Sequence, residues 1–257
     1  MRIDAHAHIE PPGRSELNGD PWGRDRLLID AADALEIDWL CCSCLAPRRP
    51  SLPEDFVACN SHLQHAIEAF PGRILGYAYV NPGYQREAVA EIERCVREFG
   101  FIGAKLYNEY KFTDPAVRPV IEKCIELDVL ILHHAGHTWW PLPGQPNISD
   151  AGDFAQVVAE YPELKLICGH IAGGGDWEWT IKALREEPRL FADTSGSVVD
   201  EGMIEKAVAL MGADRLLFAC DMSMTAGVGK ILGADITEEQ RDAIFSGNIR
   251  RLLGGRI

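Results

Sequence analysis

The feature that most constrains this chain is the regular alternation of short apolar runs with longer amphipathic stretches. Eight runs are short, apolar on both faces and bounded by Gly, Pro or charged residues, as parallel strands covered on both sides are. They span residues 2–7, 37–45, 74–80, 101–107, 129–134, 164–169, 190–194 and 215–220. Helical periodicity is present at 86–99, 116–127, 150–160, 200–211 and 237–253. In the first of these, the expected apolar face consists of Val89, Ile92, Val96 and Phe99.

Eight strands alternating with helices over 257 residues predict one domain, a distorted (β/α)8 TIM barrel spanning residues 1–257. The competing architecture, a doubly wound open sheet, often carries a glycine-rich phosphate loop after its first strand. Here the first strand ends in Ala-His-Ala-His, and glycines 173–175 lack the G-x-G-x-x-G spacing. The two long insertions, 10–26 and 136–149, follow strands. In a barrel they lie at the C-terminal ends of the strands, where active sites are built.

Composition excludes several classes of partner. With 25 Lys and Arg against 39 Asp and Glu, the formal charge is −14, which disfavours nucleic acid and anionic membrane surfaces. No apolar run approaches the ~20 residues that a membrane span needs, and the N-terminus lacks an apolar signal core, so we expect a cytoplasmic protein. The eight cysteines lie mostly inside apolar runs and are expected to be buried thiols. Cys41 and Cys44 form a C-x-x-C without a second pair to complete a zinc site.

Histidines gather at the ends of the expected strands. His6 and His8 are two residues apart on the first strand, so their side chains project the same way. His134 ends the fifth strand, His170 the sixth, and Asp221 the eighth. Imidazole nitrogens with one carboxylate are the ligand set of zinc or a similar divalent ion. A single buried histidine is usually a core residue, but this many at strand ends predict a metal site.

At these residues the chain resembles a known family. The motif Asp4-Ala5-His6-Ala7-His8 looks like the opening signature of the amidohydrolase superfamily, and later landmarks match its amidohydrolase 2 branch in order. They are Val80-Asn81-Pro82, Gly103-Ala104-Lys105-Leu106, His134-Ala135-Gly136, Pro162 through Gly169-His170, Phe218 through Asp221, and Gly247-Asn248. Any one of these motifs alone is weak evidence. The ordered set covers nearly the whole chain and is specific.

The resemblance implies one divalent ion, zinc, with a bound water in the remaining position. The ligands it implies are His6, His8, His134 and Asp221. In such proteins the counterpart of His170 either positions water or substrate, or ligates a second ion. His134 matches the family ligand because it precedes Ala135-Gly136. Strand alternation points the neighbouring His133 to the opposite face, where we expect it to pack against a helix.

Lys105 carries an alternative. In two-metal members of the superfamily, a lysine on the fourth strand is carbamylated and bridges the ions, whereas many amidohydrolase 2 members carry the lysine without a second metal. We expect Lys105 to pair with an acidic group or with substrate, because a buried ammonium needs a counter-charge. The two-metal alternative stays open here.

The substrate pocket is expected from the loops. Four tryptophans are expected at one mouth of the barrel, on the loops after the fifth and sixth strands: Trp139, Trp140, Trp177 and Trp179. They either line a planar or apolar small-molecule substrate or bury against a partner subunit of a homo-oligomer. Arg48 and Arg49 follow the second strand and either clamp a substrate carboxylate or remain exposed. Two departures from the family pattern, at Ala135 and at Cys220-Asp221-Met222-Ser223, leave the substrate undefined.

The first functional prediction is a metal-dependent hydrolase that cleaves an amide, a lactone or another ester of a small organic acid. The ion would lower the pKa of its water toward ~7, Asp221 would accept the proton, and His170 would orient the carbonyl or stabilise the oxyanion. The alternative is a lyase, because the branch also contains decarboxylases of aromatic acids and hydratases with the same ligands. Those decarboxylases tend to be longer, which favours hydrolysis. A metal-binding protein without turnover is a third reading, but no ligand or acid/base residue is missing.

Overall fold

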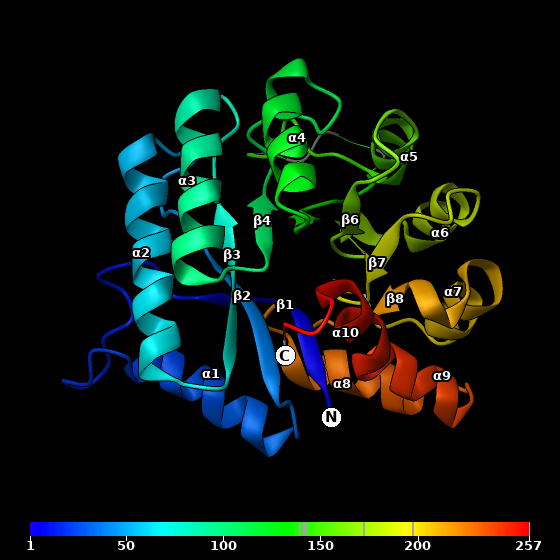
Figure 1. The fold of residues 1–257 in the computed structure, drawn as a ribbon. Coiled ribbons are helices and arrows are strands. Elements are labelled where there is room, and N and C mark those ends of the chain that lie inside the picture. Colours follow the sequence, from blue (N-terminus) through cyan, green and yellow to red (C-terminus); the bar gives the residue numbers. More distant parts are fainter. Residues whose placement is uncertain (139, 141–142, 172, 197, 257) are drawn as a thin grey trace.

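The computed structural model describes residues 1–138, 140, 143–171, 173–196 and 198–256. Its centre is a single sheet of parallel strands in which each strand pairs with the next along the chain. The strands are β1 (Ile3–Ile9), β2 (Trp39–Cys44), β3 (Ile74–Tyr79), β4 (Gly103–Leu106), β5 (Leu130–His133), β6 (Lys165–Cys168), β7 (Phe191–Asp193) and β8 (Leu216–Leu217). This order confirms the predicted (β/α)8 barrel (Figure 1).

Helices surround the strands on the outside (Figure 1). They are α1 (Gly23–Ala34), α2 (Pro53–Ala69), α3 (Gln85–Phe99), α4 (Arg118–Glu126), α5 (Ala151–Glu160), α6 (Trp177–Arg185), α7 (Met203–Met211), α8 (Met224–Gly233), α9 (Glu238–Asp242) and α10 (Asn248–Leu253). Short helical turns are η1 (Pro115–Val117), η2 (Gly173–Gly175), η3 (Ala213–Arg215) and the π-helical η4 (Ala243–Gly247). No helix of the described residues is long and apolar enough to cross a bilayer.

The predicted boundaries differ from the observed ones in places that matter. β1 runs to Ile9, so His8 lies within the strand, and β8 ends at Leu217, well before Asp221. Four helices were not predicted: α1, which begins inside the predicted loop 10–26, and α2, α6 and α8. The single helix expected over 237–253 is divided into α9, η4 and α10. The side chain of Asp176 explains α6, because it accepts a hydrogen bond from Trp179 N and so caps the helix.

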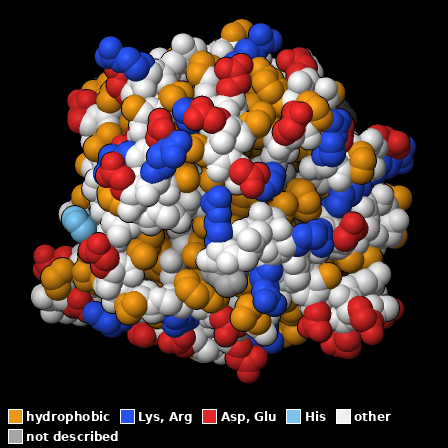
Figure 2. Space-filling model, in the orientation of Figure 1, with side chains coloured by type: hydrophobic (Ala, Val, Ile, Leu, Met, Phe, Trp, Pro, Cys, Tyr) orange, Lys and Arg blue, Asp and Glu red, His pale blue; other side chains and the backbone are white. Residues whose placement is uncertain are grey.

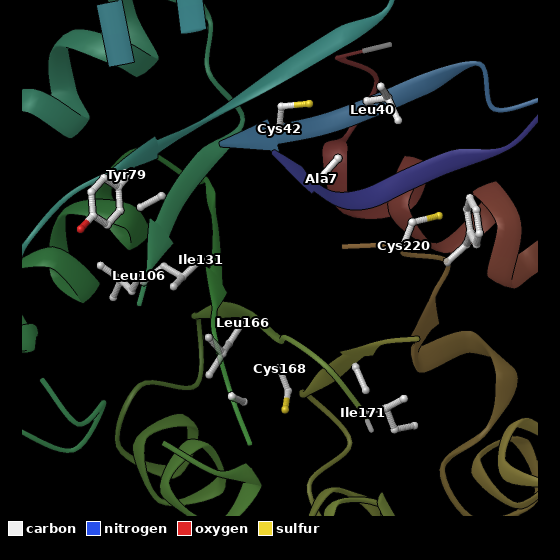
Figure 3. Close-up of a cluster of buried hydrophobic side chains, with 14 of the residues drawn as sticks. Ala7, Leu40, Cys42, Tyr79, Leu106, Ile131, Leu166, Cys168, Ile171 and Cys220 are labelled. Carbon is white, nitrogen blue, oxygen red and sulfur yellow. The ribbon is translucent and has the colours of Figure 1, made fainter. Parts of the chain in front are cut away.

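The core has two layers. One cluster fills the barrel interior and includes Tyr77, Ile102 and Leu132, with Ile249 and Leu253 of α10 packed against it. A larger cluster lies between the strands and the helices, and Figure 3 shows part of it, including Leu106, Ile131 and Leu166 from three neighbouring strands. All eight cysteines are buried and free, which confirms the prediction of buried thiols.

The apolar face predicted for α3 is displaced by about one residue. Ile92 is fully buried, but Val89, Val96 and Phe99 are only partly buried, and Ala88, Glu91 and Cys95 complete the buried stripe. Glu91 is buried because its Oε1 accepts hydrogen bonds from Asn60 Nδ2 at 3.0 Å and from Arg94 Nη2 at 2.7 Å. A paired carboxylate can therefore occupy a position that hydrophobicity alone would not assign to the core.

The outer surface carries both signs of charge. On the face shown in Figure 2, Lys and Arg side chains are interspersed with Asp and Glu side chains. The face in that view therefore has no continuous basic surface of the kind that binds a phosphate backbone.

Backbone hydrogen bonds join the last strand region to the first. Ala5 N donates to Phe218 O at 2.9 Å, and Asp221 N donates to His6 O at 2.8 Å. The pairing of β1 with β2 shifts register between Asp4 and Ala7. This irregularity resets the alternation of side chains: Ile3 and Ala5 belong to the interior cluster, and His6 also faces the interior.

Asn248 of α10 ties the end of the barrel to the backbone before and within β8. Its Nδ2 donates to Ala213 O at 2.7 Å and to Leu216 O at 2.8 Å, and its side chain is buried. Replacing Asn248 by Ala should lower the free energy of unfolding by about 1–3 kcal/mol, because the two carbonyls lose their donor. Urea unfolding measures the change. Arg250→Ala, at an exposed position of the same helix, is the control and should stay within about 0.5 kcal/mol of the wild type.

Candidate metal centre and active site

Two histidines of β1 point into the barrel, each with one ring nitrogen held by a residue of another strand. His6 Nδ1 lies 2.8 Å from Asp193 Oδ2 at the end of β7, and His8 Nδ1 lies 2.9 Å from Ser43 Oγ on β2. A carboxylate can only accept, so His6 Nδ1 carries the proton and donates it. His6 Nε2 is therefore the lone-pair nitrogen, which is the arrangement of histidines that bind metals.

Asp221 completes a cluster with these two rings. Its Oδ1 lies 3.1 Å from His8 Nε2 and 3.7 Å from His6 Nε2, and its Oδ2 lies 3.7 Å from His170 Nδ1. Ligand atoms of His6, His8 and Asp221 all lie within 4.8 Å of one another. Two imidazoles and one carboxylate at this spacing can surround one divalent ion.

Burial sets the charges in this cluster. It lowers the pKa of His6 and of His8, and the nearby Lys105 ammonium adds to the effect. Burial alone would raise the pKa of Asp221, but the hydrogen bond with His8 and the rings of His6 and His170 hold it well below its usual range. At neutral pH the imidazoles are thus neutral and the aspartate is ionised, which is the protonation state that a metal ion requires.

Lys105 enters the same space from β4. Its side chain is fully buried and its Nζ lies 2.6 Å from His6 Nε2. Burial lowers the pKa of Lys105 to about 8, while the charges of Asp221 and Asp193 oppose that shift. The direct contact of Nζ is thus an imidazole, rather than the acidic side chain that the sequence led us to expect.

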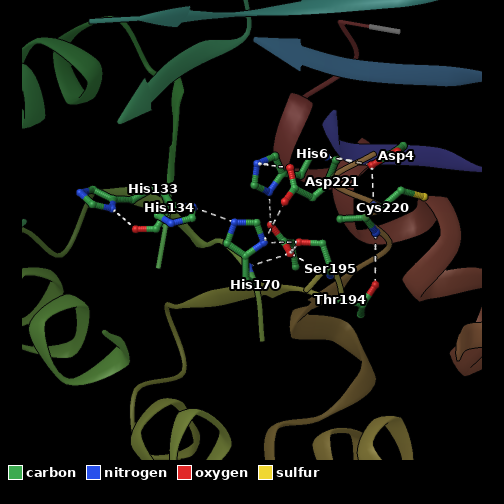
Figure 4. Close-up of polar contacts among 12 residues, drawn as sticks. Asp4, His6, His133, His134, His170, Thr194, Ser195, Cys220 and Asp221 are labelled. Atoms are coloured by element: carbon green, nitrogen blue, oxygen red, sulfur yellow. Dashed lines mark hydrogen bonds and ion pairs between the residues drawn. The ribbon is translucent and has the colours of Figure 1, made fainter. Parts of the chain in front are cut away.

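His170 and His134 form a second pair of rings beside the cluster (Figure 4). His170 Nδ1 lies 2.8 Å from Ser195 Oγ, and its Nε2 lies 2.9 Å from His134 Nδ1. His134 Nε2 lies 3.1 Å from Gln145 Oε1. His134 is therefore engaged with His170 and Gln145 in this structure, and its nitrogens do not join the group formed by His6, His8 and Asp221. Burial lowers the pKa of His170 to about 3, so this ring is neutral.

The two histidines at the end of β5 separate as expected. His133 is buried and packs against Phe112 and against Phe154 of α5, with ring centroids 4.9 Å and 5.2 Å apart. The prediction that it packs away from the site against a helix is confirmed.

Sequence reasoning missed Asp193, which connects most of the site. Its Oδ2 contacts His6 Nδ1, and its Oδ1 accepts from His170 N and Ser195 N, each at 2.9 Å. The available signal was the same one that identified Asp221, an acidic residue at the end of a strand. Asp4 was noted only as part of a motif. Its Oδ1 accepts from His6 N and from Cys220 N, both at 3.0 Å, and so positions both sides of the cluster.

The backbone is strained at the site. His170, Asp221 and Met222 adopt left-handed φ values of 66°, 43° and 70°. Such values cost non-glycine residues about 1–3 kcal/mol each and are retained where the surrounding structure needs them. Here they turn the chain sharply after β6 and after β8, so that His170 and Asp221 face each other.

The residues predicted to line the pocket lie in different surroundings. Trp139 lies outside the described residues. Trp140 is 79% exposed, and Trp177 is the first residue of α6 rather than part of a loop, with its Nε1 donating to Asp200 at 2.8 Å. Arg48 is exposed.

Arg49 is also exposed, but its guanidinium contacts an aromatic ring beside the site. The guanidinium of Arg49 lies 4.4 Å from the ring centroid of Tyr107, which in turn stacks on His134 at 4.1 Å. This places a permanent cation beside the histidine pair.

Comparison with known proteins identifies the family. The family model described as amidohydrolase matches residues 3–255. The chain belongs to the amidohydrolase family. It is 25% identical to a 2-keto-4-carboxy-3-hexenedioate hydratase of Sphingobium sp., over 76% of this chain and 70% of the relative. It is 26% identical to a gamma-resorcylate decarboxylase of Rhizobium sp., over 91% of both chains.

Solved structures show the same fold. The 2,6-dihydroxybenzoate decarboxylase from Rhizobium superposes with a TM-score of 0.77 at 21% identity, covering 98% of each chain. The dihydroxybenzoic acid decarboxylase from Polaromonas sp., with bound manganese and the inhibitor 2-nitroresorcinol, gives 0.76 at 21% identity, covering 98% of this chain and 96% of that one.

These relatives overturn the prediction of a hydrolase. One relative is a hydratase and the others are decarboxylases, so all of them are lyases. The similarity therefore does not support hydrolysis of an amide, lactone or other ester. The prediction was wrong because two histidines and an aspartate serve both reaction types. The decarboxylases are longer, as expected, because their alignments span 302 and 307 positions against 257 residues here. Their extra length does not favour hydrolysis, however, because they match 91% and 93% of this chain.

Asp4 generates a pH prediction for the metal-free protein. Burial raises the pKa of Asp4 from 3.8 to about 7 in the folded chain. The stability that its protonated form provides is complete below pH 3.8 and is lost as the pH rises toward 7, by about 1.4 kcal/mol per pH unit. Asn resembles the protonated carboxyl and cannot ionise. The free energy of unfolding of Asp4→Asn, relative to wild type, should therefore increase from pH 4 to pH 7.

Urea unfolding at several pH values across that range measures this difference. Asp30→Asn, at an exposed position of α1, is the matched control. A difference between Asp4→Asn and wild type that does not change with pH would contradict the assignment.

Proposed function

We propose that this protein is a divalent-metal-dependent lyase that removes carbon dioxide from a small aromatic carboxylic acid. The observation that carries the proposal is the cluster of His6, His8 and Asp221 with its neutral imidazoles and ionised carboxylate. Two decarboxylases among the relatives, which match 91% and 93% of this chain at 26% and 27% identity, point to the reaction.

The proposed metal site holds one ion. His6, His8 and Asp221 are the proposed ligands. His134, which the family resemblance adds, would join them by turning away from Gln145. Manganese is the first metal to test, because solved decarboxylases of this fold contain it, and zinc is the alternative. A second ion through a carbamylated Lys105 is the less favoured reading, because Asp193 and His170 already bind protein partners.

In the proposed reaction, the side chains have separate roles. When bound, the ion acts as a Lewis acid that polarises an oxygen of the substrate. Asp221, ionised at rest, accepts the proton of a ring hydroxyl as the substrate binds. The bond between the ring carbon and the carboxylate then breaks, its electron pair stays on the ring carbon, and Asp221 returns the proton to that carbon. Lys105 and Arg49 supply positive charge near the departing carboxylate.

Hydration is the second candidate, and one observation favours it. The hydratase of Sphingobium sp. matches 76% of this chain. In that reaction Asp221 would accept a proton from water as the oxygen adds to a carbon–carbon double bond. The Asp221 carboxylate can act in both reactions, so the identity of the substrate determines which of the two takes place.

A substrate panel tests the proposal. Manganese-loaded protein should release carbon dioxide from 2,6-dihydroxybenzoate or 5-carboxyvanillate, and chelation should abolish the release until manganese returns. Incorporation of labelled water oxygen into 4-oxalomesaconate, without carbon dioxide, would instead establish hydration. Metal-loaded protein that acts on neither class would contradict a lyase.

Asp221→Asn separates catalysis from metal binding. Asn keeps one carbonyl oxygen as a ligand but cannot take up a proton at neutral pH. The variant should retain much of its metal while kcat and kcat/KM both fall by about 10²–10⁴. Metal analysis and steady-state kinetics measure the two effects, with Asp242→Asn, an exposed position of α9, as control. Near-normal turnover by metal-loaded Asp221→Asn would place the acid/base elsewhere, with His170 as the next candidate.

A further inference from the structure

A cavity of about 270 Å³ opens directly beside the candidate metal centre. Its lining includes His8 and Met222, the residue after Asp221. Met222 adopts a left-handed φ of 70°, and its side chain is 50% exposed. A molecule whose reacting end lay at His8 and Asp221 would therefore extend its other end into this space.

The walls of the cavity are mainly apolar. Leu28 of α1 and Leu45, which follows β2, face it together with Met222. Leu28 is only 8% exposed, so its place in the cavity is fixed by the surrounding core. The volume is close to the lower end of the range of about 300–1,000 Å³ for small-molecule sites, which suits one ring with a short substituent.

The charged groups in the lining disfavour an anion in the cavity. Glu10, Asp25 and Arg24 all contribute to its lining. Asp25 is buried, and its Oδ1 accepts from Glu10 N at 2.9 Å, which holds the chain after β1 against α1. An anionic substituent would meet two carboxyl groups and one guanidinium, whereas an uncharged alkyl group would contact the leucines and the methionine.

We propose that this cavity binds the part of the substrate remote from the reacting carbon, and that Leu28 and Leu45 select an uncharged apolar substituent there. The inference rests on the proposed function, because it takes the reacting carboxylate to lie at the metal centre. It places the specificity of the enzyme at the β1–α1 side of the barrel, and not at the tryptophans that follow β5 and β6.

Two matched probes test the proposal: 2-nitroresorcinol, whose nitro group has the shape of a carboxylate, and its 5-propyl derivative, which adds an alkyl chain opposite the nitro group. The experiment measures the dissociation constants of both probes for manganese-loaded protein. Wild type should bind the propyl compound about tenfold or more tightly, because three carbons leave water. Leu28→Phe and Leu45→Phe fill the cavity and should remove that advantage, while binding of 2-nitroresorcinol changes less than about threefold. Leu27→Phe, the neighbouring residue of α1 with 58% exposure, is the control and should keep the advantage.

Two outcomes would overturn the proposal: no preference for the propyl compound in wild type, or a preference unchanged in both filled variants. If wild type binds neither probe, the proposed function fails, and the cavity is judged by a crystal soaked with 4-propylphenol. Electron density for that molecule between Leu28, Leu45 and Met222 would support the subsite without the function. Its absence there would overturn the subsite as well.

Discussion

One buried carboxyl group, Asp4, joins the two parts of the backbone on which the candidate site is built. Its Oδ1 accepts hydrogen bonds from His6 N on β1 and from Cys220 N in the segment after β8. The same segment is joined to β1 by the hydrogen bond from Asp221 N to His6 O. The separation between the imidazoles and the aspartate therefore depends on Asp4. Burial raises the pKa of Asp4 to about 7, so ionisation of this carboxyl group lowers the stability of the folded chain.

Burial also sets the protonation states of the histidines in the candidate site. It keeps His6, His8 and His170 neutral and prepares them as ligands or hydrogen-bonding groups. Asp193 fixes the proton of His6 on Nδ1 and at the same time accepts from the backbone of His170 and Ser195. One carboxylate thus orients groups from β1, β6 and β7. We infer that the candidate ligand nitrogens are already oriented by these hydrogen bonds.

The error about the reaction has a physical origin. A divalent ion held by histidines and an aspartate can polarise a carbonyl for hydrolysis or a carboxylate for decarboxylation, so the ligand set does not specify the bond that breaks. That choice depends on what the loops present to the substrate. In this structure those groups include Lys105, the Arg49–Tyr107 pair and the apolar cavity beside His8. One fold can therefore host several reactions, and the groups of the pocket distinguish them.

The sequence by itself determined the barrel and the pairing of two histidines in the candidate site. Apolar runs bounded by turn residues gave all eight strands, since strands buried on both faces must be continuously apolar, and spacing along β1 paired His6 with His8. Only the tertiary structure showed that Asp193 holds His6, that His134 turns to His170 and Gln145, and that Arg49 lies over Tyr107. It also showed that the register shift in β1 turns the histidines inward. These features depend on side-chain directions and on contacts between residues up to 216 positions apart, such as Asp4 with Cys220. Local periodicity carries no information about such contacts, because they form only when the barrel closes.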